Sequence, residues 1–161
     1  MAFTSKITGA DLAFIYNVAQ GVGPSRSNLL DDVMLVQTLL KLAAFPMEIH
    51  GTGGTSEGVE VDGIFGPQTK DAIEQFDKVA KKDLHKLLIA DGVVSRCRTD
   101  AFVPGANVQF KIVHLNRAVR NRRVGWEELP LLPTTRVELR EALLPSFRLV
   151  RNSLPQPKPA F

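Results

Sequence analysis

The segment VEVDGIFGPQTKDAIEQF, residues 59–76, sets the architecture of this chain. A glycine-rich turn leads directly into a segment whose apolar residues recur at helical spacing. Gly66 and Pro67 predict the point where the helix begins, because proline is well tolerated at the first helical position. The neighbouring glycines at 51–58 match neither GxGxxG nor GxxxxGK[ST], so the sequence favours a rigid corner over a nucleotide cradle.

Apolar stripes of helical period predict a mainly α-helical protein. The expected helices run over 27–45, from 67 toward 92 as one helix or two, over 107–121, and from 135 to just before Pro145. Ser27 or Asn28 is the expected cap of the first helix, and Thr135 with Glu138 is the expected capping box of the last.

The segments between these helices are expected to be irregular or weakly structured. Residues 1–27 read as a leader with one short helix, because Leu12, Ile15 and Ala19 recur at helical spacing. Residues 46–61 carry four glycines between positions 51 and 58, which favours a flexible connection. The C-terminal tail has three prolines in its last seven residues and is expected to be extended or disordered.

The bulk composition is that of a globular chain. Its 161 residues with 44% hydrophobic content allow a sizeable core. Cys97 is the only cysteine and is expected to be an idle or buried thiol, because no base is indicated beside it. No run of eighteen apolar residues predicts a membrane span. The first residues lack the pattern of a signal peptide, so we expect synthesis in the cytoplasm and, for any role outside the membrane, delivery by a non-Sec route.

Charge is divided unevenly along the sequence. Residues 1–90 hold 8 basic and 11 acidic side chains, whereas residues 91–161 hold 12 and 6. Four arginines crowd together at Arg117, Arg120, Arg122 and Arg123. Such a cluster suits phosphate or an acidic polymer, or simply the negative end of a helix dipole. A single Tyr and a single Trp leave little for base stacking, so no nucleic-acid partner is expected.

The turn and its flanking helices resemble the small helical peptidoglycan-binding domain of bacterial cell-wall proteins. That family combines a helix of the form V..LQ..L, a turn DG.FG..T and a helix that ends in FQ. Here the first helix contains VMLVQTLL, with Gln37 at the glutamine position. The turn is matched at Asp62, Gly63, Phe65, Gly66 and Thr69. The second helix has FD where the family has FQ. The resemblance covers residues 28–80 and implies a helical bundle of the peptidoglycan-binding-domain type.

A second, shorter match follows in some bacterial relatives of that family, where a DG.V turn leads to a helix ending in LN. The corresponding residues here are Asp91, Gly92, Val94, Leu115 and Asn116. The chain departs from the family at Asp77, where glutamine is usual, and in its longer, glycine-rich loop before Val61. The match implies one enlarged unit over residues 28–125, with a C-terminal segment at 126–161 that carries a short helix and the Pro-rich tail.

The resemblance also implies a binding site. In the family, wall peptide or glycan lies in a shallow groove beside the turn, so Asp62, Ile64, Phe65 and Thr69 are the candidate lining residues. From the residues themselves, Asp62 is expected to accept hydrogen bonds within its own turn, and Gly63 and Gly66 can take positive φ. Much of the motif therefore has a structural interpretation.

No catalytic constellation is visible at motif spacing. The three histidines, His50, His85 and His114, form no HExxH pattern, and no metal or other cofactor is expected. Glu127 and Glu128 beside Trp126 are the most suggestive carboxylate pair, but that segment reads better as Trp126 anchoring the C-terminal segment onto the bundle. The protein is expected not to be an enzyme.

These observations predict a non-catalytic module that binds peptidoglycan through its stem peptide or glycan. The alternative is a scaffold or adaptor that uses the same fold to dock onto a protein partner, for example in a secretion or contractile injection assembly. An adaptor is expected to expose an apolar surface along the C-terminal segment, with Trp126, Leu131 and Leu132.

Overall fold

The computed structural model describes residues 1–7, 11–49, 52–84, 89–98, 110–122 and 124–155. The described chain is mainly α-helical, as predicted, with two short antiparallel hairpins. Its α-helices are α1 (Leu30–Ala43), α2 (Pro67–Leu84), α3 (Lys111–Asn121) and α4 (Val137–Ser153), joined by the 3₁₀ helices η1 (Ser56–Gly58) and η2 (Trp126–Leu131).

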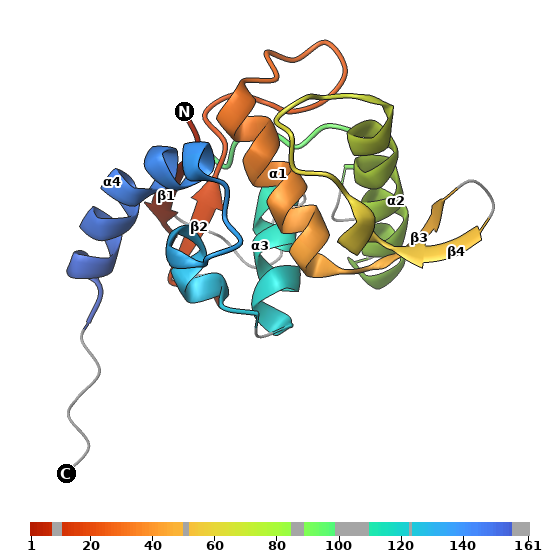
Figure 1. Cartoon of the computed structure of the whole chain (residues 1–161). Coiled ribbons are helices and arrows are strands. Elements are labelled where there is room, and N and C mark those ends of the chain that lie inside the picture. Colours follow the sequence, from red (N-terminus) through yellow and green to blue (C-terminus); the bar gives the residue numbers. More distant parts are fainter. Residues whose placement is uncertain (8–10, 50–51, 85–88, 99–109, 123, 156–161) are drawn as a thin grey trace.

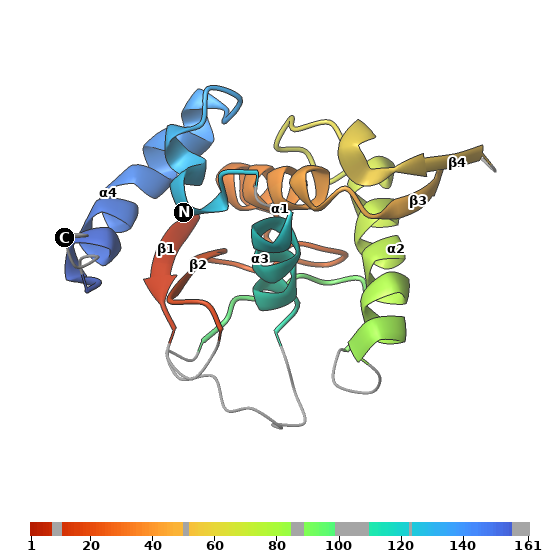
Figure 2. The ribbon, with the colours of Figure 1, turned by 90° about the horizontal axis from the view of Figure 1, so that it is seen from below.

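Helix α1 forms the centre of the molecule. Figure 1 shows α2 on one side of it and α4 on the other, and Figure 2 shows α3 packed beneath it. Residues 32–40 of α1 are all buried, because neighbours surround the helix instead of covering one face. The stripe expected from the sequence is therefore only part of the buried surface. No side chain caps α1, so the expected capping by Ser27 or Asn28 is wrong.

The N-terminal segment forms a β-hairpin, so the short helix expected within residues 1–27 is wrong. Strand β1 (Phe3–Lys6) pairs antiparallel with β2 (Phe14–Asn17), in a register that places Thr4 opposite Tyr16. All four residues of β2 are buried, with α3 against the strand. Because both faces of β2 carry apolar residues, the strand lacks the alternation of apolar and polar residues that marks a half-buried strand. The helical spacing of Leu12, Ile15 and Ala19 is therefore misleading.

The glycine-rich loop forms a second hairpin instead of a flexible connection. Strand β3 (Pro46–Ile49) pairs antiparallel with β4 (Thr52–Thr55), and Figure 1 shows this hairpin projecting beside α2. Ser56 fixes its base: the Ser56 hydroxyl donates to the Leu40 carbonyl and accepts from the Phe45 amide. Propensity disfavours Gly53 and Gly54 in a strand, but this anchoring and the pairing with β3 overcome it.

The C-terminal segment packs onto the bundle through Trp126, as predicted. Trp126 is 3% exposed and stacks on Phe14, with ring centroids 4.6 Å apart. Its indole N–H donates to Asn116 Oδ1 over 3.0 Å. Burial of Trp126 also overturns the expectation that it belongs to an exposed apolar surface.

Helix α4 differs from the sequence expectation at both ends. It continues through Pro145 to Ser153. Proline has no N–H, so the Glu141 carbonyl loses its helical hydrogen bond. Both residues are exposed, so water can satisfy that carbonyl. The expected capping box is absent: Thr135 donates instead to the Leu129 carbonyl, and Glu138 pairs with Arg136.

The sequence predicts three segments, 1–27, 28–125 and 126–161, and residues from all three pack into one hydrophobic core. Its cluster includes Tyr16 from the first segment, Ile73 from the second and Phe147 from the third. Strand β1 also packs against α4, where the Thr4 amide donates to Ser146 Oγ over 2.8 Å. The tail residues 156–161, on which the prediction of disorder fell, lie outside the described residues.

Candidate functional site

The DGIFGPQT turn is held by the amide of Gln37, which projects from α1. Gln37 Oε1 accepts from the backbone amides of Asp62 and Gly63, at 3.1 and 2.8 Å. Gln37 Nε2 lies within donating distance of Asp62 Oδ1, Thr69 Oγ1 and the Ile64 carbonyl, at 2.8, 2.9 and 3.1 Å. A neutral side chain thus satisfies donors and acceptors of the turn at once, which is the physical reason for a glutamine at this point of the first helix.

The four predicted binding residues have unequal access to solvent. Ile64 is 64% exposed, Asp62 is exposed and Phe65 is half-buried against the core. Thr69 is only 2% exposed, and its hydroxyl is held between Gln37 and the Ile64 carbonyl. The structure therefore brings the four residues together around one turn, but Thr69 has a structural position there.

Asp62 behaves as the sequence predicts. Its Oδ1 accepts from the Ile64 amide over 2.9 Å, which closes an Asx turn. This backbone hydrogen bond, together with the Gln37 amide, lowers the pKa of the Asp62 carboxyl. The carboxylate is therefore part of the turn as well as an exposed negative charge.

The two glycines of the turn have different roles. Gly63 has φ +77°, and a Cβ atom at this position would lie 2.5 Å from Leu30 Cδ1. Gly66 has no positive φ, and a Cβ atom there would meet nothing within 4 Å. The expectation of positive φ is confirmed for Gly63 and wrong for Gly66.

The second predicted turn, at Asp91 and Gly92, repeats this backbone geometry. Gly92 has φ +71°, and Asp91 Oδ1 accepts from the Val93 amide over 3.0 Å. Asp77 Oδ2 accepts from the Gly92 amide over 2.9 Å, and its Oδ1 lies 2.7 Å from Lys111 Nζ. Burial raises the pKa of Asp77, and the ion pair with Lys111 opposes that shift. Position 77, where the resembled family usually has glutamine, thus holds an aspartate whose charge is paired with the buried Lys111 of α3.

Asn116, the last residue of the second match, joins α3 to the N-terminal hairpin. Its side chain accepts from the Tyr16 amide and donates to the Tyr16 carbonyl, both over 2.8 Å. Asn116 is fully buried, as is Leu115 before it. Both residues therefore serve the core, and neither is available to a ligand.

A groove of about 1110 Å³ lies between the β3–β4 hairpin and α2. Pro67 and Gln68 of the DGIFGPQT motif line one part of it, but none of the four predicted residues does. Apolar lining comes from residues on the hairpin, on the following loop and on α2, namely Pro46, Met47, Val59 and Val79. The groove is thus adjacent to the predicted site, displaced along α2.

Polar side chains of α2 define the chemistry of this groove. Gln75 pairs with the backbone of β3, accepting from the Glu48 amide over 2.7 Å and donating to the Glu48 carbonyl over 2.8 Å. Asp71 and Lys78 line the same groove and supply opposite charges. Sequence reasoning misses these residues because the glycines of the hairpin that forms the opposite wall predict a flexible loop. The polar residues at 68, 71, 75 and 78, which recur at helical spacing, were the available signal.

The arginine cluster is largely neutralised within the fold. Asp11 lies 2.7 Å from Arg117 and 2.5 Å from Arg120, and Arg122 lies 4.0 Å from Glu57. The pKa of Asp11 is about 2: burial acts to raise it, and the hydrogen bonds and charges of Arg117 and Arg120 outweigh that effect. These contacts give the cluster a structural role, and Arg123 lies outside the described residues.

The residues considered for catalysis are separated. His114 is buried on α3, whereas His50 and His85 lie outside the described residues. Glu127 and Glu128 are exposed, and Glu128 forms an ion pair with Arg151 over 3.0 Å. Cys97 is buried, as expected. Within the described ranges, no three His, Cys, Asp or Glu side chains are grouped to hold a metal ion. None of the described helices is both long and apolar enough to cross a membrane.

Comparison of the chain with protein-family models, curated proteins and solved structures finds no match.

Proposed function

We propose that this protein is a non-catalytic module of the peptidoglycan-binding-domain type that binds the bacterial cell wall. The observation that carries the proposal is the position of the groove. It lies beside the motif that resembles the family, and two residues of that motif, Pro67 and Gln68, line it. The ligand-facing surface is the wall of α2 together with the β3–β4 hairpin.

The lining of the groove suits a fragment of wall peptide or glycan. Such fragments carry amides, hydroxyls and charged groups on a small apolar framework. Asp71 and Lys78 offer opposite charges, and Gln75, whose amide pairs with the backbone of Glu48, holds β3 against α2 as the opposite wall. Met47 and Val79 supply apolar contact. A few polar groups on an apolar lining are typical of small-ligand sites.

The proposal assigns the predicted turn a supporting role. The Gln37 network and Gly63 fix the start of α2, and α2 then presents Asp71, Gln75 and Lys78 to the groove. Ile64 and Phe65 precede the groove-lining Pro67 in the chain, and Ile64, which is 64% exposed, is available for additional contact. Delivery of the protein to the wall by a non-Sec route belongs to the same proposal.

The alternative function is that of an adaptor. The observation that favours it is the exposed apolar pair of Leu30 and Ile64, which are 52% and 64% exposed. Ile64 follows Gly63 in the chain, and a Cβ atom at Gly63 would lie 2.5 Å from Leu30 Cδ1, so Leu30 is next to the same turn. In this version a protein partner covers the corner of the turn, while the groove is left open.

Co-sedimentation with purified sacculi tests the proposal. We expect the protein to pellet with sacculi and to remain bound at moderate salt, because groove recognition does not rely on long-range charge. Lys78→Glu reverses a charge in the groove and is expected to reduce binding about ten-fold. Lys82→Glu, an exposed residue on the same helix outside the groove, is the matched control.

The same experiment separates the two functions. Equal binding by both lysine variants, or binding that disappears with salt in all three proteins, contradicts groove recognition. Loss of sacculus binding in Ile64→Ser alone assigns the contact to the corner of the turn. We further expect no release of muropeptides or reducing sugar, and release by the purified protein contradicts the non-catalytic assignment.

A further inference from the structure

We propose that a second site, independent of the groove, binds a phosphate group between Arg26, Arg96 and Arg98. The three arginines line a small pocket of about 190 Å³, several times the ~30 Å³ that a water molecule occupies in the liquid. Serine hydroxyls and backbone complete the lining, with Ala19, Gln20, Gly21, Ser25, Ser27 and Ser95. A phosphate dianion matches this combination of guanidinium and hydroxyl donors.

The pocket is built from two loops that are distant in sequence. Val22 and Val94 form an isolated antiparallel bridge, with N–H···O distances of 3.0 and 2.8 Å. The bridge places Arg26, which follows Val22, beside Arg96 and Arg98, which follow Val94. Two backbone hydrogen bonds thus bring together arginines that lie about seventy positions apart in the chain.

The first loop is held in an unusual backbone conformation. Ser25 and Asn28 have φ values of +57° and +47°, which are uncommon for residues other than glycine. The Asn28 side chain accepts from the Gly23 amide and donates to the Gly23 and Arg26 carbonyls, at 2.9, 3.0 and 3.1 Å. The surrounding structure therefore fixes the backbone of Arg26, as a preorganised site requires.

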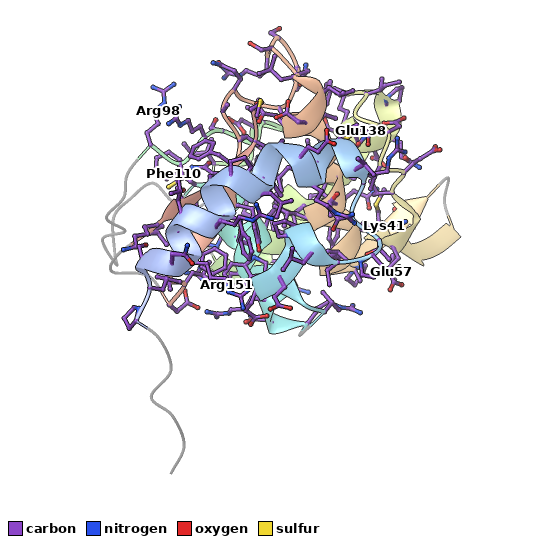
Figure 3. All side chains as sticks on the ribbon, turned by 60° about the vertical axis from the view of Figure 1, so that its left-hand side comes forward. Lys41, Glu57, Arg98, Phe110, Glu138 and Arg151 are labelled. Atoms are coloured by element: carbon purple, nitrogen blue, oxygen red, sulfur yellow. The ribbon has the colours of Figure 1, made fainter. Side chains whose placement is uncertain are left out.

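The second loop is fixed through Cys97. Its amide donates to Asn17 Oδ1 over 3.1 Å, and its carbonyl accepts from Asn17 Nδ2 over 2.8 Å. Because Cys97 is turned into the core, Arg96 and Arg98 on either side of it are exposed. The Arg96 guanidinium lies over the Phe3 ring, 4.9 Å from its centroid. Figure 3 shows Arg98 extending outward from the body of the molecule.

Most of the other arginines in the described chain have partners within the fold, and the exception is Arg148 on α4. Those at 117, 120, 122, 136 and 151 each lie within 4.0 Å of a carboxylate, and Arg140 donates to three backbone carbonyls. Within the described residues, no ion pair engages Arg26, Arg96 or Arg98. The three guanidinium groups line one concavity and donate no hydrogen bond to another described residue, so their N–H groups are available to a ligand.

One carboxylate lies beneath the first loop and sets the charge balance. Asp32 is fully buried, and its oxygens accept from the Ala19 and Gln20 amides at 2.9 and 2.8 Å. Its lone pairs are thus directed to the backbone of the loop. Three arginines and one aspartate leave a charge of +2, which a phosphate dianion neutralises. A monoanion such as acetate leaves an excess positive charge.

Isothermal titration of the full chain at low ionic strength tests the site. Inorganic phosphate and glycerol 3-phosphate are the two probes, since the free ion and a monoester share the dianion, and acetate is the monoanionic comparison. We expect saturable binding of at least one dianion, with acetate at least about ten-fold weaker. Binding of phosphate alone identifies the free ion as the ligand, and preference for the ester identifies a phosphorylated molecule.

Arginine variants locate the binding. Arg26→Gln and Arg98→Gln are each expected to weaken it about ten-fold, because each removes charge-assisted hydrogen bonds. Arg148→Gln, an exposed arginine on α4 with no ion pair to another described residue, is the matched control and is expected to leave binding unchanged. Unaltered melting temperatures establish that the variants fold, which is expected because neither Arg26 nor Arg98 forms a side-chain hydrogen bond or ion pair with a described residue.

Amide chemical-shift changes on titration provide the second readout and are expected at residues 19–27 and 95–98. No saturable binding of either dianion, or equal weakening by Arg148→Gln, overturns the proposal. Lys78→Glu separates the two sites. It is expected to leave phosphate binding intact whether or not the protein binds sacculi.

Discussion

Gly63 and Gly92 each follow an aspartate, each has a positive φ, and each belongs to a turn closed by that aspartate. The two turns nevertheless differ in what holds them. At the first, the uncharged amide of Gln37 contacts donors and acceptors alike. At the second, the carboxylate of Asp77 accepts from Gly92 and requires Lys111 to balance its charge.

The difference shows two ways of satisfying a buried backbone turn. A neutral amide needs no counter-ion, so its loss costs hydrogen bonds only. A buried ion pair carries a desolvation cost for both charges, and removing one partner leaves the other charged in an apolar environment. The second turn is therefore the more sensitive to substitution and to pH.

The largest expected effect is at the buried ion pair. Lys111→Met keeps the apolar length of the side chain but leaves Asp77 without its counter-ion. We expect a loss of about 3–5 kcal/mol in the free energy of unfolding, measured by urea denaturation. The double variant Lys111→Met with Asp77→Asn is expected to recover part of this loss. A change below about 1 kcal/mol in the single variant contradicts the importance of the pair.

The neutral turn should respond less strongly. Gln37→Leu retains the volume of the side chain and removes its hydrogen bonds to the turn. We expect a loss of about 3 kcal/mol or less, because the buried Gly63 amide loses its acceptor. Urea denaturation at pH 5.5 and 7.5 should give the same difference from the parent protein. A strong pH dependence of that difference contradicts the interpretation that loss of the uncharged Gln37 amide costs hydrogen bonds only.

Helix α3 carries a second pH-sensitive group one turn after Lys111. Burial lowers the pKa of His114 to about 4, the neighbouring Arg117 adds to this effect, and Asp11 opposes it. Between pH 4 and the ordinary value of 6.5, the unfolded chain binds more protons than the folded protein. Stability should therefore rise with pH across this window, by about 2–3 kcal/mol, and be fully present above it.

His114→Gln, compared with the parent protein by urea denaturation at pH 4.5, 5.5 and 7.5, isolates this contribution. We expect a flatter pH profile in the variant. Identical slopes in the two proteins assign the pH dependence to other groups.

Alanine substitutions compare the glycines directly and give the smallest effects. Gly63→Ala should cost about 2 kcal/mol, since it adds contact with Leu30 to the cost of positive φ. Gly92→Ala should cost about 1 kcal/mol, because its Cβ atom would lie 3.6 Å from Glu74 and only φ is unfavourable. Gly66→Ala should change stability by less than about 0.5 kcal/mol. Thermal melts of the three variants check this order, and equal effects at Gly63 and Gly66 contradict it.

The helical part of the fold was accessible to sequence reasoning, because α1, α2 and α3 contain apolar residues at helical spacing over many turns. The Asp–Gly turns were also accessible, since aspartate and glycine favour this geometry locally. The end of α4 was not. A proline normally ends a helix, and only its exposed position allows the helix to continue through Pro145.

The hairpins and the candidate sites required the tertiary structure. Leu12, Ile15 and Ala19 fit a helix by spacing, yet β2 is extended because both of its faces are covered. The groove has the glycine-rich β4 as part of its wall, and glycine carries no pattern to reveal a strand. The arginines of the phosphate pocket are brought together by a single pair of valines, which no local pattern indicates.

The contact between Thr4 and Ser146 has a consequence for biosynthesis. The two residues are 142 positions apart, so β1 leaves the ribosome long before α4, the helix that covers it. Until α4 and Trp126 have emerged, the aromatic side chains of β2 lack the rings against which they pack in the finished molecule. This part of the molecule therefore completes its folding only after α4 has emerged, with an apolar hairpin exposed in the nascent chain until then.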